Sequence, residues 1–271
     1  MSKAATLDLA AVKTRQQVTW ASGDYAEIAT LIVPTAERLV DAADLSAGST
    51  VLDVASGSGN AAIAAGRLGC TVTGIDYVPA LLERARERAR AERLGIDFRH
   101  GDAEAIPFPD EAFDASISIF GVMFAPDQWV TAAELSRVTR PGGTIALGSW
   151  TPDGFIGEMF RTIAAHVPPP AGLASPLAWG TEAHLADLFG PEVAWTHRVR
   201  TFTFRFTSAD AFVERFAVYY GPTVKAFEAA GASREALAHD LRELASSANR
   251  LPEPGPIAVP ATYLESIGTR G

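Results

Sequence analysis

The amino-acid sequence predicts an α/β protein built on a doubly wound, mostly parallel sheet of seven strands, with a helical lid inserted near the C-terminus. Between residues 50 and 150, short apolar strands alternate with helical stretches, which is the pattern of successive parallel βαβ units. The first of these strands runs into a turn with two glycines, and the next two end in acidic residues. Beyond Trp150 the alternation stops, and helices and two longer strands follow.

The strands of the parallel part are short and mostly apolar. We expect them at residues 51–54, 70–76, 96–102, 113–120 and 144–150. Helices join them, and Pro79 suits the first turn of the helix after the second strand. The run Arg140-Pro141-Gly142-Gly143 predicts a tight turn just before the fifth strand.

The C-terminal part has a different order of elements. Residues 193–206 predict a long strand, because phenylalanines alternate with polar residues in its second half, and residues 257–269 predict one more. Between them, residues 210–250 predict two or three helices separated near Gly231. The simplest topology pairs the two strands at the edge of the sheet, with residues 207–255 inserted as a helical lid.

Composition argues against several classes of partner. The net charge of −9 over 271 residues disfavours binding to nucleic acid or to an anionic membrane surface. No run of about 18 apolar residues predicts a membrane span, and the first residues lack the apolar run of a signal peptide. The single cysteine, Cys70, allows no intrachain disulfide. We therefore expect a cytoplasmic protein.

The glycine turn permits two interpretations. Gly57, Gly59 and Ala62 fit the dinucleotide fingerprint, with Asp76 placed to bind a ribose, so a nicotinamide-dependent oxidoreductase is one hypothesis. Asp53 precedes the glycines, where its charge opposes a pyrophosphate but suits the amino group of a cationic ligand. Asp76 and Asp102 end successive strands and suit a ribose diol and an exocyclic amine. With no basic residue between positions 51 and 66, the ligand is better described as a nucleoside that lacks phosphates and carries a positive tail.

These residues carry a family resemblance. Leu52-Asp53-Val54-Ala55-Ser56-Gly57-Ser58-Gly59-Asn60 resembles motif I of the class I S-adenosylmethionine-dependent methyltransferases. Gly74-Ile75-Asp76-Tyr77, the stretch from Gly101 to Asp110, Phe113-Asp114 and the turn at 140–143 follow in the family's order. The set is similar to the ubiquinone/menaquinone-biosynthesis type and covers about residues 48–150. It implies a Rossmann-like methyltransferase fold, S-adenosylmethionine as cofactor and S-adenosylhomocysteine as product.

The resemblance also implies the residues of the cofactor site. Residues 55–59 would pass under the methionine part, Asp76 would bind the ribose hydroxyls with Tyr77 stacked on the adenine, and Asp102 would bind the adenine amino group. The full expected set is Tyr25, Asp53, Ala55, Ser56, Gly57, Gly59, Asn60, Asp76, Tyr77, Asp102, Ala103, Ile119 and Phe120. Many family members have glycine where this chain has Ala55, and we expect alanine to be tolerated there if the position is strand-like. Tyr25 and Trp20 flank a turn, where they either pack in the core or cover the ligand.

The order of the predicted elements, taken with the resemblance, divides the chain into four segments. We expect an N-terminal helical or lid segment (1–45), an S-adenosylmethionine-binding core (46–206), a helical insertion over the acceptor site (207–255) and a final edge strand (256–271).

A general base is not identified by any motif. The candidates are His166, His184, His197, Tyr219 and Tyr220, all in the half expected to bind the acceptor, and an enzyme of this kind can also work by orientation alone. The five histidines show no metal-ligand spacing, so we expect no metal site. Ile119-Phe120-Gly121 differs from the signature of amino-methylating DNA enzymes and lacks the acidic cluster of catechol-type enzymes.

The sequence thus predicts a metal-independent methyltransferase that acts on a small-molecule acceptor. O- or C-methylation is favoured and N-methylation is next. Besides the oxidoreductase, the alternative is a protein that keeps the fold and the cofactor without transferring a methyl group, as a pericyclase does.

Overall fold

The structure is a computed structural model that describes residues 7–252 and 254–271. Its centre is one seven-stranded sheet with the strand order β3-β2-β1-β4-β5-β7-β6. The strands are β1 (Thr50–Val54), β2 (Thr71–Asp76), β3 (Asp97–His100), β4 (Phe113–Ile119), β5 (Thr139–Trp150), β6 (Val193–Phe206) and β7 (Ile257–Arg270). The first five are parallel, and β7 is antiparallel to both β5 and β6. The predicted α/β sheet with a terminal strand pair is confirmed.

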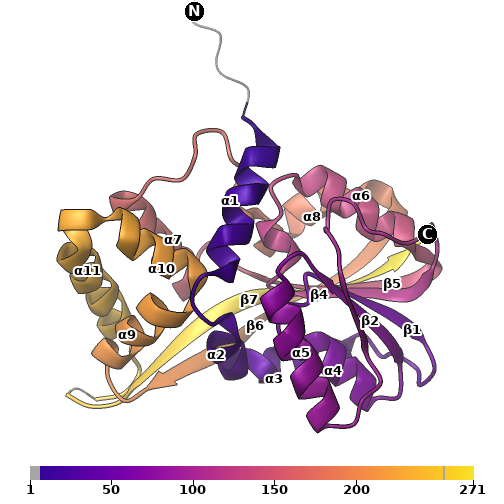
Figure 1. Ribbon diagram of the computed structural model, residues 1–271, viewed down its shortest axis with the longest axis horizontal. Helices are drawn as coiled ribbons and strands as arrows, with labels where there is room; N and C mark the ends of the chain where they lie inside the picture. Colours follow the sequence, from indigo (N-terminus) through magenta and orange to yellow (C-terminus); the bar gives the residue numbers. More distant parts are fainter. Residues whose placement is uncertain (1–6, 253) are drawn as a thin grey trace, which may run out of the picture.

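Helices cover both faces of the sheet (Figure 1). One face packs against α3 (Val33–Ala42), α4 (Asn60–Arg67) and α5 (Pro79–Ala91), around a core that includes Leu39, Val51 and Ala85. The other face carries α6 (Gln128–Val138) and α8 (Glu182–Phe189) over a core that includes Leu135 and Leu147. Covering both faces explains why the parallel strands are almost continuously apolar.

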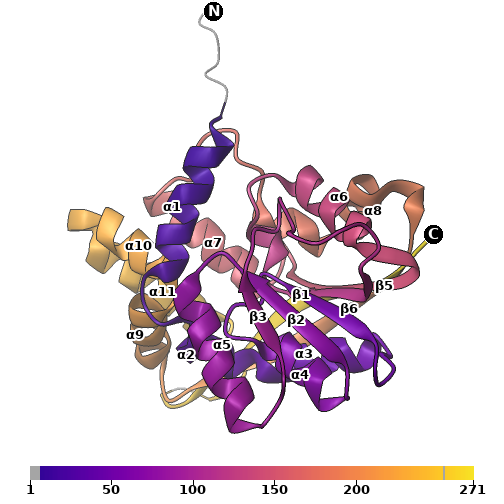
Figure 2. The same ribbon diagram turned by 45° about the vertical axis from the view of Figure 1, so that its right-hand side comes forward.

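A group of helices packs beyond the parallel strands, at the left of Figure 1. It comprises α7 (Phe155–His166), α9 (Ala209–Tyr219), α10 (Gly221–Ala229) and α11 (Arg234–Ser247). The last three lie in the chain between β6 and β7, where an inserted helical segment is predicted. Two N-terminal helices, α1 (Leu9–Ala21) and α2 (Tyr25–Ala29), complete this side, and α1 packs beside α10 (Figure 2).

Short 3-10 turns connect the remaining elements. They are η1 (Thr30–Ile32), η2 (Val122–Phe124), η3 (Pro176–Gly180), η4 (Gly190–Glu192) and η5 (Gly231–Ser233). In the part of the chain that the structure describes, no helix is long and apolar enough to cross a membrane.

Two details of the sheet correct the sequence-based expectations. The final strand, β7, is not the edge strand, since it lies between β5 and β6 and leaves β6 at the edge. The burial of the two strands agrees with this order, because most of β7 is buried whereas β6 exposes threonines and arginines, as an edge strand that avoids aggregation does. Residues 140–143 are also not a turn before β5. They lie within it, where the pairing with β4 shifts between Phe113 and Ala115.

Candidate functional site: a pocket at the carboxyl edge of the sheet

The turn after β1 has a left-handed backbone at three positions. The φ angles are +55° at Ala55, +53° at Gly57 and +83° at Gly59. A Cβ atom at Gly59 would lie 3.0 Å from the Phe98 ring and 3.1 Å from the Ala85 side chain, so both φ and packing demand glycine there. The condition under which we expected alanine to be tolerated is not met, because Ala55 is not strand-like. Its left-handed φ explains why glycine is common at this position in the family, since glycine adopts that conformation without strain.

The Asp53 side chain points toward the N-terminus of α4 and does not line the pocket. Its carboxylate is 1% exposed and accepts a hydrogen bond of 2.8 Å from the amide of Ala62 in the first turn of α4. Burial raises the pKa of Asp53 to about 8. Asp53 was expected to contact the cofactor's amino group; its side chain instead lies outside the lining of the pocket. Its carboxyl group accepts from an otherwise free amide at a helix N-terminus. Gly59, also expected in the site, is likewise outside the lining of the pocket.

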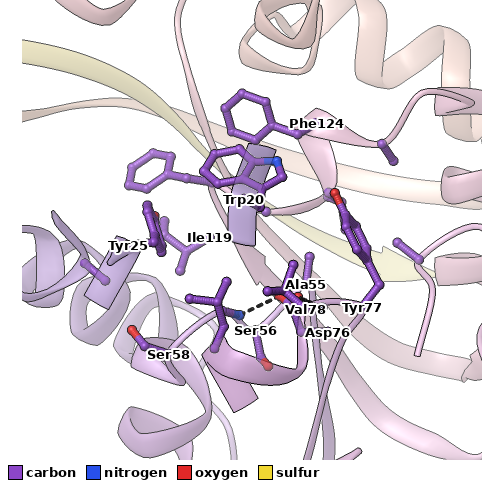
Figure 3. Close-up of a pocket in the computed structure, with 18 of the residues that line it drawn as sticks. Trp20, Tyr25, Ala55, Ser56, Ser58, Asp76, Tyr77, Val78, Ile119 and Phe124 are labelled. Carbon is purple, nitrogen blue, oxygen red and sulfur yellow. Dashed lines mark hydrogen bonds between the residues drawn. The ribbon is translucent and has the colours of Figure 1, made fainter. Parts of the chain in front are cut away.

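The pocket itself opens above the turn and collects most of the predicted residues. Ala55, Ser56, Gly57, Asn60, Asp76 and Tyr77 line it together with Tyr25, Asp102, Ala103, Ile119 and Phe120. Figure 3 shows Tyr25 and Tyr77 on opposite sides, with Asp76 beside the turn. Because parallel strands end at one edge of the sheet, residues from β1, β2 and β4 meet here.

Asp76 is the central acidic group of the pocket. One carboxylate oxygen accepts a hydrogen bond of 2.9 Å from the Gly57 amide, and the other accepts one of 2.8 Å from the Val78 amide. Burial raises the pKa of Asp76 to about 6, against the lowering effect of these two amides. Ser56 also lines the pocket, but its buried hydroxyl, which has no hydrogen-bond partner, lies toward Gly74, where a Cβ atom built on that glycine would be 3.2 Å from it.

Helix α1 contributes Lys13 and Gln17, which the sequence reasoning missed, as well as Trp20, which it named. The Lys13 Nζ lies 2.6 Å from Asp102 Oδ2 and 2.5 Å from Glu104 Oε2, and the Gln17 side-chain amide donates to the Tyr77 carbonyl at 2.6 Å. Trp20 follows one turn later and lines the same pocket. Positions 13, 17 and 20 share one face of a helix. That spacing was the available signal, but it does not by itself say what the face covers.

Aromatic rings close the pocket on the side away from Asp76. Trp20 makes edge-to-face contacts with Tyr25, Phe124 and Tyr220, at centroid distances of 5.5, 4.9 and 5.7 Å. Phe120 stacks on Trp150 at 3.8 Å. These rings line a small inner chamber of about 20 Å³ that adjoins the pocket at Trp20, Tyr25 and Phe120. Such a wall excludes water and favours a cation near the ring faces.

The candidate bases are mostly elsewhere. His166 pairs with Asp240 at 2.7 Å, His184 with Gln128 at 2.7 Å and His197 with Ser266 at 2.9 Å; all three lie outside the lining of the pocket and the chamber. Tyr219 lines a separate groove beside α9. Of the five candidates, Tyr220 alone faces the inner chamber, and complete burial raises its pKa well above the ordinary value of 10.

Known proteins resemble this chain in both sequence and structure. Residues 52–147 match the family model described as a methyltransferase domain. An uncharacterized protein of Mycobacterium tuberculosis is 43% identical over 212 residues, which is 77% of each chain. The demethylmenaquinone methyltransferase of Deinococcus radiodurans is 40% identical over 126 residues, 45% of this chain and 52% of that protein. The YcgJ protein of a Bacillus species shares the fold, with a TM-score of 0.61 at 18% identity over 87% of this chain and 97% of that one.

The family model spans the glycine turn, Asp76 and Asp102, the same residues that line the pocket. The chain belongs to the class I S-adenosylmethionine-dependent methyltransferases, of the type that resembles the enzymes of quinone biosynthesis.

Proposed function

We propose that this methyltransferase acts on carbon or oxygen of a small, partly apolar acceptor whose reactive atom enters the aromatic chamber, without the help of a metal ion. The observation that carries the proposal is the position of that chamber. It adjoins the cofactor pocket at Phe120, and its lining is almost entirely aromatic and aliphatic.

The pocket fits the cofactor. Its lining brings Asp76, Tyr77 and Asp102 together beside the glycine turn, as the resemblance implies. We assign Asp76 to the ribose hydroxyls, which can donate to an ionised carboxylate. We assign Asp102 and the Ala103 backbone to the adenine amino edge and Tyr77 to the adenine face. The cofactor, when bound, supplies an electrophilic methyl group on a sulfonium.

The aromatic wall supports transfer by orientation and water exclusion. An in-line displacement is faster when the reacting atoms are held in near-attack geometry. A site without water also keeps the nucleophile and the cationic group from being solvated. Phe120 and Tyr25 border both the pocket and the chamber, so they would hold the acceptor against the methyl group.

The state of Tyr220 favours an acceptor that needs no strong base. Burial holds its pKa well above 10, so at neutral pH its hydroxyl is protonated and can donate a hydrogen bond to an acceptor oxygen but cannot remove a proton. An electron-rich carbon, or an oxygen that is already ionised, reacts under these conditions. Such a site is compatible with the C- or O-methylation that we propose.

Product analysis tests the proposal. The enzyme is incubated with S-adenosylmethionine and a panel of phenols, enols and amines, and S-adenosylhomocysteine release is measured together with the mass of each product. Methylated phenols or enols are the expected products. Preferential methylation of amines would contradict the assignment, and cofactor binding without any release would favour the non-methylating alternative.

A further inference from the structure

An arginine of α5 holds the glycine turn from behind. The Nη1 atom of Arg88 lies 2.6 Å from the carbonyl oxygen of Ser58, 3.2 Å from the hydroxyl of Ser58 and 2.7 Å from Asn60 Oδ1. Arg84 and Arg86 of the same helix pair with carboxylates. Among the described residues, by contrast, the hydrogen bonds of Arg88 all go to the turn and to the first residue of α4.

These contacts are made in a buried part of the molecule. Ser58 is 1% exposed and Asn60 is 9% exposed, and burial lowers the pKa of Arg88. Hydrogen bonds from a charged donor are stronger than those between neutral groups. The turn needs such a donor, because Gly57 and Gly59 adopt left-handed φ angles on either side of Ser58 and α4 begins without a side-chain cap. Loss of the guanidinium would take a charged donor from two buried oxygens.

The other end of the Asn60 amide reaches α2. Its Nδ2 atom donates a hydrogen bond of 2.8 Å to the carbonyl oxygen of Ala29, the last residue of that helix, where carbonyls lack a partner within the helix. Ala29 and Tyr25 lie one turn apart on the same face of α2, and both line the cofactor pocket. A guanidinium only donates and a backbone carbonyl only accepts, so the two contacts fix the orientation of the amide. Arg88, Asn60 and Ala29 thus form a chain that joins α5, the glycine turn and α2.

We propose that Arg88 and Asn60 are positioning residues for the cofactor. Arg88 holds the turn in place under the methionine part, and Asn60 extends the same restraint to the α2 side of the pocket, where Tyr25 lies. The proposal rests on the assignment of this turn to the methionine part. It places Asn60 in the support of the site, because both ends of its side-chain amide are already bonded to the protein. A turn that is ordered before the ligand arrives binds it more tightly, since less conformational entropy is lost on binding.

The test compares two ligands by calorimetry on the intact protein. Arg88→Met keeps most of the aliphatic stem and removes the donors. S-adenosylhomocysteine should bind about tenfold more weakly to this variant, the value of one hydrogen bond to a charged group. Adenosine, which lacks the homocysteine part, should keep its wild-type affinity to within about twofold, the usual effect of a substitution away from a binding site. Arg90→Met, at an exposed position of the same helix, should change neither affinity.

The comparison separates positioning from a general loss of structure. Equal weakening of both ligands in Arg88→Met, or unchanged binding of S-adenosylhomocysteine, would overturn the proposal. Arg88→Lys replaces the planar fork by a single ammonium group, so its affinity for S-adenosylhomocysteine should lie between those of the wild type and Arg88→Met. An affinity no higher than that of Arg88→Met would contradict the role of the charged donor. Failure of the wild-type protein to bind S-adenosylhomocysteine would instead overturn the cofactor assignment, so the two failures are distinguishable.

A second variant covers the case in which Arg88→Met does not fold. Asn60→Asp keeps an oxygen for Arg88 and suits the N-terminus of α4. Beside the guanidinium it stays ionised, so it cannot donate to the Ala29 carbonyl. Without any ligand, hydrogen exchange in residues 25–32 should accelerate about 2–10-fold, the value of one neutral hydrogen bond, while the turn at 55–60 keeps its wild-type rate. Wild-type exchange in residues 25–32, or equal acceleration in the sheet, would contradict the proposal.

Discussion

The attachment of α1 to the cofactor pocket can be tested through one lysine. Lys13→Met keeps most of the aliphatic stem of the side chain but removes the ammonium group that bridges Asp102 and Glu104. Without it, two carboxylates face each other at the mouth of the pocket. The helix is also held by its packing beside α10, by the buried Val12 and by the contacts of Gln17 and Trp20.

The size of the effect follows from the exposure of the three side chains. The side chain of Lys13 is 28% exposed, that of Asp102 29% and that of Glu104 10%. The stabilising free energy of these contacts therefore lies between that of exposed ion pairs, about 0.2–1 kcal/mol, and that of charge-assisted hydrogen bonds, about 1.5–3 kcal/mol. Taking about 1–2 kcal/mol for the loss, local opening of α1 should become roughly 5–30 times more frequent.

Hydrogen exchange followed by mass spectrometry measures this opening directly. Amides of α1 should exchange about 5–30 times faster in Lys13→Met, with the sheet unchanged. Lys225→Met is the control, since it removes an exposed pair with Glu228 on α10, away from the pocket. Exchange of α1 at the wild-type rate in Lys13→Met, or equal acceleration in the control, would show that the Lys13 pairs do not hold the helix.

Three further substitutions test the turn and its carboxylates. Asp76→Asn should weaken binding of S-adenosylhomocysteine by about 1–3 kcal/mol, the loss for a hydrogen-bonded carboxylate, and unchanged affinity in calorimetry would remove Asp76 from the ribose site. Asp53→Asn tests the raised pKa of about 8. Because the folded state retains a proton that the unfolded state releases above about pH 4, the wild type loses stability as pH rises from about 4 to 8. The free energy of unfolding of the variant, measured in urea, should therefore rise relative to that of the wild type between pH 5 and 9. A difference between the two proteins that does not change with pH would contradict this. Gly59→Ala should cost about 1–2 kcal/mol for its left-handed φ, plus the cost of the contacts with Phe98 and Ala85. Gly142→Ala, with φ +74° and open space around it, should show the first cost alone, and equal losses in urea midpoints would exclude the packing contribution.

The parallel sheet and its ligand edge could be predicted because their signals are local. Each strand is a short apolar run, and the acid at the end of β2 falls at the carboxyl edge by the geometry of parallel strands alone. Asp76, Tyr77 and Phe120 therefore line the pocket as the motifs imply.

Features that depend on how distant segments pack could not be predicted. Asp53 belongs to the same motif as Gly57, yet its side chain lies on the α4 side of the sheet and accepts a hydrogen bond from the Ala62 amide. The histidines of the acceptor half pair with Asp240, Gln128 and Ser266 away from the site, because nothing in their local pattern states which way each element faces.

The sequence by itself determined the parallel sheet, the glycine turn and the family's cofactor, since these depend on neighbours within a few residues. The tertiary structure alone decided that β7 lies between β5 and β6 in the sheet. It also decided that α1 contacts the pocket through Lys13, and that Trp20 and Phe124 separate the pocket from an apolar groove between α1 and α7. Those arrangements are set by the burial of surfaces far apart in the chain, and a pattern within one segment records that a surface is apolar without recording its partner.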